Sequence, residues 1–116
     1  MTAAKRILLV EDDQAIRDIV ALALEGEGHE VAAASDGAGA LDRVAGATFD
    51  VIVLDLRLPG MDGREFVQRY RESGSAGARL VLMTASTDGD ALAAELGARS
   101  IAKPFDLPAL LALVAE

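Results

Sequence analysis

The chain has 116 residues, of which 52% are hydrophobic and 3% aromatic, and it contains no cysteine. This length suits one domain with a single core, and the lack of cysteine excludes disulfides and thiolate metal sites. The formal net charge of −8 opposes direct binding to nucleic acid, and the first apolar run is too short for a signal sequence or a membrane span. We therefore expect a soluble, cytoplasmic protein that binds neither nucleic acid nor membranes.

Short β-branched runs alternate with helical patterns along the chain, which is typical of a parallel sheet joined by crossover helices. The predicted strands are, in chain order, 6–10, 29–34, 50–54, 79–83 and 100–102. The predicted helices are 14–25, 38–45, 64–72, 88–96 and 107–115, and the first of them could begin at residue 13 instead of 14. The run 50–54 is the most apolar and should lie in the centre of the sheet. These units leave no room for a second domain, so we expect residues 1–116 to fold as one.

Polar side chains stand where four of the predicted strands end. They are Glu11, Asp12, Asp55, Thr84 and Lys103. The carboxyl ends of parallel strands share one edge, where ligands bind in open α/β sheets, so these side chains should meet in one pocket. Three carboxylates, a hydroxyl and an ammonium suit a divalent cation and a phosphoryl group, with one carboxylate as the nucleophile.

The three acidic residues of this set and the neighbouring Asp13 have different explanations. Asp13 is expected to cap the helix that follows it. Glu11 and Asp12 are adjacent carboxylates that repel each other, and oxygen ligands without a cysteine or histidine partner favour Mg²⁺. Asp55 follows four buried aliphatic residues, which is a costly place for a charge unless something pairs with it. We expect these three carboxylates and the backbone carbonyl of Arg57 to hold Mg²⁺, with water completing the shell.

Thr84 and Lys103 each have a simple alternative explanation. A hydroxyl at a strand end often bonds to its own backbone, and a lysine before Pro104 is usually just solvated. Brought to one edge, however, the two side chains could both contact a bound phosphoryl group. Phosphoryl transfer needs little more than positioning and charge neutralisation.

Five segments of the chain carry a family resemblance. They are residues 7–13, 51–55, 58–63, 83–85 and 103–105. Through them the whole chain closely resembles the receiver domains of bacterial two-component response regulators. The resemblance implies a flavodoxin-like α/β fold, a single five-stranded parallel sheet of order 2-1-3-4-5 with helices on both faces. It implies that Asp55 accepts a phosphoryl group from a sensor histidine kinase or a phosphotransfer protein. It also implies that Mg²⁺ binds at Glu11, Asp12 and Asp55. Thr84 and Lys103 would contact the phosphoryl oxygens.

Ser100 is a departure from this pattern, because receivers commonly carry at that position an aromatic residue that swings inward on phosphorylation. The threonine half of the switch pair is present as Thr84, and the aromatic half is not. A receiver-like binding module that works without phosphorylation is therefore an alternative. A phosphatase of the haloacid dehalogenase type is disfavoured, because such enzymes need Asp-x-Asp after the first strand.

Further expectations concern regions outside the polar cluster. With Ser100 in place of a ring, the change on phosphorylation should be concentrated in residues 85–89 and at the helix start near Asp88. The single histidine, His29, should lie at the surface and take no part in phosphotransfer. The outer face of helix 107–115 leaves a homodimer or an effector contact open. We expect either a stand-alone receiver or one joined to an output domain, with enzymatic activity limited to its own phosphorylation and dephosphorylation.

Overall fold

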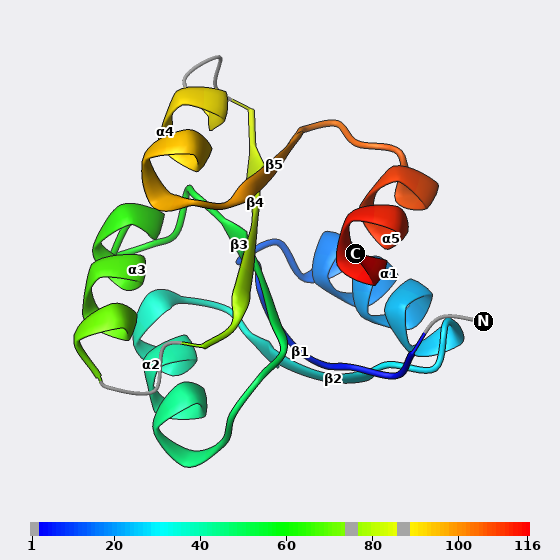
Figure 1. Ribbon diagram of the computed structural model, residues 1–116, viewed down its shortest axis with the longest axis horizontal. Helices are drawn as coiled ribbons and strands as arrows, with labels where there is room; N and C mark the ends of the chain where they lie inside the picture. Colours follow the sequence, from blue (N-terminus) through cyan, green and yellow to red (C-terminus); the bar gives the residue numbers. More distant parts are fainter. Residues whose placement is uncertain (1–2, 74–76, 86–88) are drawn as a thin grey trace.

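The computed structural model describes residues 3–73, 77–85 and 89–116. Within these residues, five parallel strands form one sheet of order β2-β1-β3-β4-β5 (Figure 1). The strands are β1 (Arg6–Val10), β2 (Glu30–Ala34), β3 (Val51–Asp55), β4 (Arg79–Thr84) and β5 (Arg99–Ala102). The flavodoxin-like α/β class and the strand order expected from the sequence are confirmed.

Helices cover both faces of the sheet. They are α1 (Gln14–Gly26), α2 (Gly37–Gly46), α3 (Gly63–Glu72), α4 (Gly89–Leu96) and α5 (Leu107–Ala115). Figure 1 shows α1 and α5 on one side of the sheet and the other three helices on the opposite side. Alternate residues of the central strands supply the two cores, because successive side chains of a strand point to opposite faces. Leu8 and Ile52 belong to one core, and Ile7 and Val53 to the other.

Aspartate side chains cap the N-termini of three of these helices. The side chain of Asp13 accepts a hydrogen bond from the N–H of Ile16 (3.1 Å), which confirms its predicted capping role. Asp36 and Asp62 cap α2 and α3 in the same way, at 2.7 and 2.8 Å. Each side-chain oxygen satisfies an N–H that has no partner inside the helix.

The element boundaries agree with the predictions to within one residue for most elements. β3 runs one residue further than expected, so that Asp55 is its last residue. The expected start of α4 near Asp88 lies outside the described residues, and the helix is described from Gly89. None of the described helices is long and apolar enough to span a membrane.

His29 is buried, so its predicted place at the surface is wrong. Only 6% of its surface is exposed, and its Nδ1 accepts a hydrogen bond from the backbone N–H of Lys5 (3.1 Å). It shares a surface hollow with α5 residues such as Leu111. A sequence pattern contains no information on which distant helix covers a residue at a strand start. His29 directly precedes β2, at the amino-terminal end of the strands, whereas the predicted site residues lie at the carboxyl ends, as expected.

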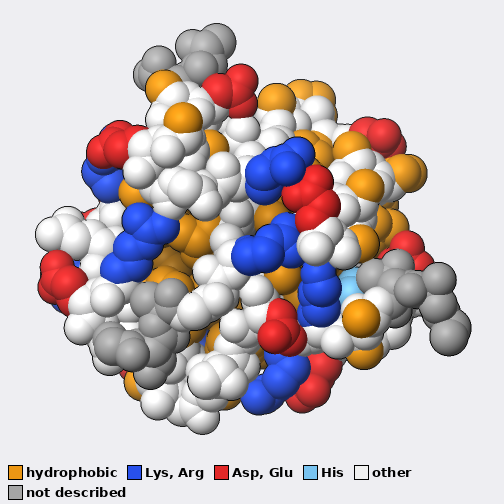
Figure 2. Space-filling model, viewed as in Figure 1, with side chains coloured by type: hydrophobic (Ala, Val, Ile, Leu, Met, Phe, Trp, Pro, Cys, Tyr) orange, Lys and Arg blue, Asp and Glu red, His pale blue; other side chains and the backbone are white. Residues whose placement is uncertain are grey.

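Charged side chains are dispersed over the surface. Figure 2 shows Lys and Arg side chains interleaved with Asp and Glu side chains on the face drawn. Glu116 is one example, because its Oε1 lies 2.9 Å from Nη1 of Arg99 and 3.8 Å from Nη2 of Arg79. Such exposed pairs contribute little to stability, but they break the surface into small patches of alternating sign.

Candidate functional site

The carboxyl ends of β1, β3, β4 and β5 lie side by side at one edge of the sheet. In the parallel register, Val10 pairs with Leu54, and Asp55 pairs with Met83. Thr84 pairs with Ala102, the residue before Lys103. This register brings together side chains that are far apart in sequence, and it is the geometry on which the predicted pocket depended.

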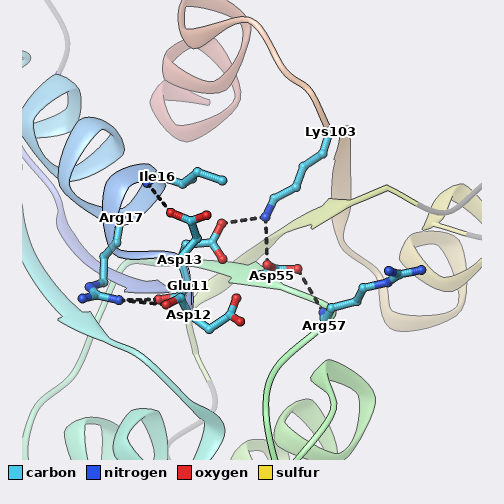
Figure 3. A network of polar contacts seen from close by, with 8 residues as sticks. All are labelled: Glu11, Asp12, Asp13, Ile16, Arg17, Asp55, Arg57 and Lys103. Carbon is cyan, nitrogen blue, oxygen red and sulfur yellow. Dashed lines mark hydrogen bonds and ion pairs between the residues drawn. The ribbon is translucent and has the colours of Figure 1, made fainter.

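An ion-pair network joins three of the predicted site residues. Lys103 Nζ lies 2.6 Å from Oε1 of Glu11 and 2.8 Å from Oδ2 of Asp55 (Figure 3). Glu11 is fully buried and Asp55 is 5% exposed, whereas Asp12 is exposed. The ammonium is thus placed between two buried carboxyl groups and offsets their mutual repulsion.

The pKa values within this network shift in different directions. Burial, followed by the proximity of the Asp55 carboxyl group, raises the pKa of Glu11 to about 7. Burial also acts upward on Asp55, but the neighbouring Glu11 carboxyl group and hydrogen bonds from Lys103 and the backbone of Arg57 outweigh it and lower the pKa of Asp55. Burial opposes the charge on Lys103, yet bonds to both carboxyl groups raise its pKa. Near neutral pH, Asp55 is therefore an anion and Glu11 is the group that can retain a proton.

Asp55 has its second carboxylate oxygen held by the backbone. Its Oδ1 accepts a hydrogen bond from the N–H of Arg57 (2.9 Å), so both oxygens are oriented. The side chain of Arg57 points away from Asp55 in Figure 3. The carbonyl of Arg57 as a metal ligand stays a prediction.

Three carboxylates fit the requirements of a divalent cation. Ligand oxygens of Glu11, Asp12 and Asp55 all lie within 4.8 Å of one another. Among the described residues, Oε2 of Glu11 is buried without a hydrogen-bond partner, which is costly for a charged oxygen unless a proton or a cation satisfies it. A set made only of carboxylate oxygens suits a hard cation such as Mg²⁺. The acidic cluster predicted from the sequence is thus present and has an unsatisfied oxygen.

Thr84 is buried at the end of β4, beside the strand that carries Asp55. Its carbonyl accepts a hydrogen bond from the backbone N–H of Lys103 (2.7 Å). The two residues expected to contact the phosphoryl group are thus linked through the backbone. Gly89 at the start of α4 packs against its side chain so closely that a Cβ on Gly89 would overlap Cγ2 of Thr84. Thr84 is therefore in direct contact with both β5 and α4.

Arg17 belongs to the site, although the sequence analysis did not single it out. Its Nη1 donates a hydrogen bond to the carbonyl of Glu11 (2.9 Å) and lies 3.5 Å from the carbonyl of Asp12. One sequence signal could have identified it. A cation near the start of a helix is unfavourable to the helix dipole, so its presence there calls for a specific acceptor.

The comparisons with known sequences agree on one family. The profile described as "Response regulator receiver domain" matches residues 7–115. The DNA-binding response regulator MtrA of Mycobacterium tuberculosis (strain ATCC 25618 / H37Rv) is 38% identical over 116 residues, which cover 97% of this chain and 50% of MtrA. The response regulator ArlR of Staphylococcus saprophyticus is 36% identical over 112 residues, which cover 94% of this chain and 50% of ArlR. The chain spans about half the length of these curated relatives.

Solved structures show the same fold. The chemotaxis response regulator CheY4 of Vibrio cholerae superposes with a TM-score of 0.88 at 32% identity, with 97% of each chain covered. The receiver domain of sensor histidine kinase PA1611 from Pseudomonas aeruginosa PAO1, described with a magnesium ion coordinated in its active-site cleft, gives 0.86 at 28% identity. That match covers 97% of this chain and 95% of the other. Neither comparison supports the homodimer that the sequence left open. The sequence matches, the strand order and the cluster of Glu11, Asp12 and Asp55 agree with one another. This chain belongs to the family of response regulator receiver domains.

Proposed function

We propose that residues 1–116 act as one receiver domain that accepts a phosphoryl group on Asp55. The donor is the phosphohistidine of a sensor histidine kinase or a phosphotransfer protein. The observation that supports this most is the state of Asp55, a buried anion with both oxygens oriented and an ammonium 2.8 Å away. A carboxylate with a lowered pKa at the ligand-binding edge of the sheet is suited to be a nucleophile.

The transfer step is a displacement at phosphorus. A carboxylate oxygen of Asp55 attacks in line with the phosphorus–nitrogen bond of the phosphohistidine. As the new oxygen–phosphorus bond forms, the phosphorus–nitrogen bond breaks and its electron pair returns to the imidazole. The product is an acyl phosphate on Asp55. Attack of water on its phosphorus later releases inorganic phosphate and restores the carboxylate.

The neighbouring side chains stabilise the charge that this step moves. Lys103, already bonded to Asp55, would follow the transferred negative charge and pair with a phosphoryl oxygen. Thr84 would donate a hydrogen bond from its hydroxyl to another phosphoryl oxygen. Glu11, Asp12 and Asp55 would hold Mg²⁺, with the carbonyl of Arg57 as a further ligand. When bound, Mg²⁺ neutralises charge on the carboxylates and the phosphoryl oxygens.

An apolar groove beside the site supports docking of the phosphodonor protein. It has a volume of about 460 Å³ and lies between α1 and the segment that follows β5. It is lined by Ile16, Ile19, Val20, Lys103, Pro104, Phe105 and Leu107. Ile19 is 56% exposed, so it adds accessible surface to a continuous apolar groove, and such a groove favours a partner contact. A helix that carries the phosphohistidine could pack here and present its imidazole to Asp55.

Phosphorylation by a small donor tests this proposal without a kinase. Intact-mass measurement after incubation with acetyl phosphate and Mg²⁺ should show one added phosphoryl group in the wild type and none in Asp55→Asn. Asp42→Asn, an exposed change on α2, is the matched control and should be modified like the wild type. Modification of Asp55→Asn would identify another acceptor.

Ser100 is the observation that favours the alternative, a binding module that works without phosphorylation. It stands where the resemblance to receivers implies an aromatic switch residue. A wild-type chain that stays unmodified by acetyl phosphate and does not bind beryllofluoride, while folded and loaded with Mg²⁺, would favour this alternative.

A further inference from the structure

Arg17 holds the backbone from which two of the acidic side chains project. It is half-buried on α1, and its Nη1 donates to the carbonyl of Glu11 at 2.9 Å. The same nitrogen lies 3.5 Å from the carbonyl of Asp12, at the outer limit of a hydrogen bond. In Figure 3, Arg17 and Lys103 approach the acidic cluster from opposite sides. Lys103 contacts the carboxyl groups, whereas Arg17 contacts the main chain behind them.

The placement of Arg17 is costly unless these contacts serve a purpose. The backbone N–H of Arg17 donates a hydrogen bond to the carbonyl of Asp13, so Arg17 lies at the end of the first turn of α1. A positive charge there opposes the helix dipole. Within the described residues Arg17 forms no ion pair, so attraction to a particular carboxylate does not account for it. Long side chains on a helix point back toward its N-terminus, which brings the guanidinium to the carbonyls that precede the helix.

We propose that Arg17 is a positioning residue for the divalent-cation site. By bonding to successive carbonyls it fixes the two peptide planes that follow β1, and with them the directions in which Glu11 and Asp12 present their carboxylates. The inference rests on the proposed function, because it presumes that Mg²⁺ binds to these carboxylates. Groups that orient metal ligands from outside typically change metal affinity by about 10- to 100-fold when removed.

Positioning and simple electrostatics predict opposite signs for the removal of Arg17. A positive charge near a cation site repels the cation, so its removal alone would strengthen Mg²⁺ binding. The loss of an oriented backbone would weaken binding instead, because the side chain of Asp12 is exposed and makes no hydrogen bond or ion pair within the described residues. The direction of the change therefore separates the two effects.

Isothermal titration with Mg²⁺ on the full chain tests the proposal. We expect Arg17→Gln to weaken Mg²⁺ binding by about 10-fold. Arg17→Lys should also weaken it, since the shorter lysine side chain does not reach the position from which Nη1 of Arg17 contacts both carbonyls. Arg43→Gln removes the same charge from an exposed position on α2 and is the control, with an affinity equal to or slightly above that of the wild type.

Several outcomes separate this inference from the proposed function. Equal or tighter binding by Arg17→Gln would overturn the positioning role while leaving the Mg²⁺ site intact. Absence of Mg²⁺ binding by the folded wild type would overturn the metal site itself, and the inference with it. Thermal unfolding without Mg²⁺ shows whether Arg17→Gln folds. If it does not, wild-type affinity in Arg17→Lys would overturn the proposal.

The dependence of phosphorylation on Mg²⁺ gives a second readout. With acetyl phosphate as donor, Arg17→Gln should need about 10-fold more Mg²⁺ for half-maximal rate, in line with its weaker binding. At saturating Mg²⁺ its rate should approach that of the wild type, because Arg17 does not touch the phosphoryl group. A lower saturated rate with an unchanged Mg²⁺ requirement would contradict the positioning role.

Discussion

Ser100 on β5 donates a hydrogen bond from its Oγ to Oδ1 of Asp90 in the first turn of α4, at 2.6 Å. Serine has no aromatic ring that could fill space near Thr84, and its hydrogen bond ties β5 to α4 instead. The neighbouring Gly89 packs directly on Thr84. A displacement of Thr84 would therefore reach α4 by contact, without any large movement of β5.

This arrangement predicts where the signal appears. Beryllofluoride should change amide hydrogen exchange at the start of α4, around Gly89, and change it little at Ser100. The reason is that added charge can bias only contacts that differ between the two states. Residues 86–88, where part of the change is also expected, lie outside the described residues. Asp55→Asn treated in the same way is the control. Changes centred on 100–102, with the start of α4 silent, would show that another element moves.

Glu11 predicts a pH dependence of stability when Mg²⁺ is absent. Its pKa is raised from an ordinary value of 4.5 to about 7, so between these pH values the folded chain keeps a proton that the unfolded chain has lost. The free energy of unfolding should therefore fall as the pH rises through this window. Asp55 acts at lower pH and in the other direction. Its lowered pKa stabilises the fold above the ordinary value of 3.8, and this contribution is lost on acidification below it.

Urea unfolding of the wild type and of Glu11→Gln, both in chelator, isolates the contribution of Glu11. The difference between the two curves should change between about pH 4.5 and 7 in the direction stated, and be flat above. Because the proton and the cation compete for the same carboxylate, Mg²⁺ should also bind more tightly at pH 8 than at pH 6. A difference that does not vary with pH would mean that Glu11 is ionised throughout.

Lys103 should couple phosphorylation to the conformational change. Lys103→Ala leaves Glu11 and Asp55 without their shared cation, so both carboxyl pKa values should rise, and the fold should lose about 1–3 kcal/mol near neutral pH. Acetyl phosphate should still modify some of the protein. Amide chemical shifts near Gly89 should then respond less than in the wild type, and Lys103→Arg serves as a charge-preserving control. Equal shifts at α4 in Lys103→Ala and in the wild type would contradict this role.

Ile19 should matter for a protein donor and not for a small one. Ile19→Glu places a charge in the apolar groove and should slow phosphotransfer from a histidine kinase that phosphorylates the wild type. Its modification by acetyl phosphate should stay normal, because the groove lies outside the bonds that orient Asp55. Ala45→Glu, an exposed change on α2, is the control for added charge. Equal kinase rates in both variants would place the docking surface elsewhere.

The sequence by itself determined the sheet, its helices and which polar residues lie at the carboxyl ends of the strands. Strand and helix periods are local properties, and the parallel arrangement requires the strand ends to meet. Lys103 and Glu11, separated by 92 positions, could therefore be predicted as neighbours and lie 2.6 Å apart. Helix capping by Asp13 was equally predictable, because the cap and the N–H that it satisfies are close in sequence.

Only the tertiary structure decided how the neighbours divide their roles. The raised pKa of Glu11 and the lowered pKa of Asp55 depend on burial and on individual hydrogen bonds, which no spacing of residues specifies. The bond of Ser100 to Asp90 and the burial of His29 depend on where α4 and α5 pack against the sheet. The contact of Arg17 with the carbonyls behind the acidic pair depends on the direction of one long side chain. These features follow from packing between distant segments, where a small shift of one segment against another changes donor–acceptor distances and angles enough to make or break a hydrogen bond.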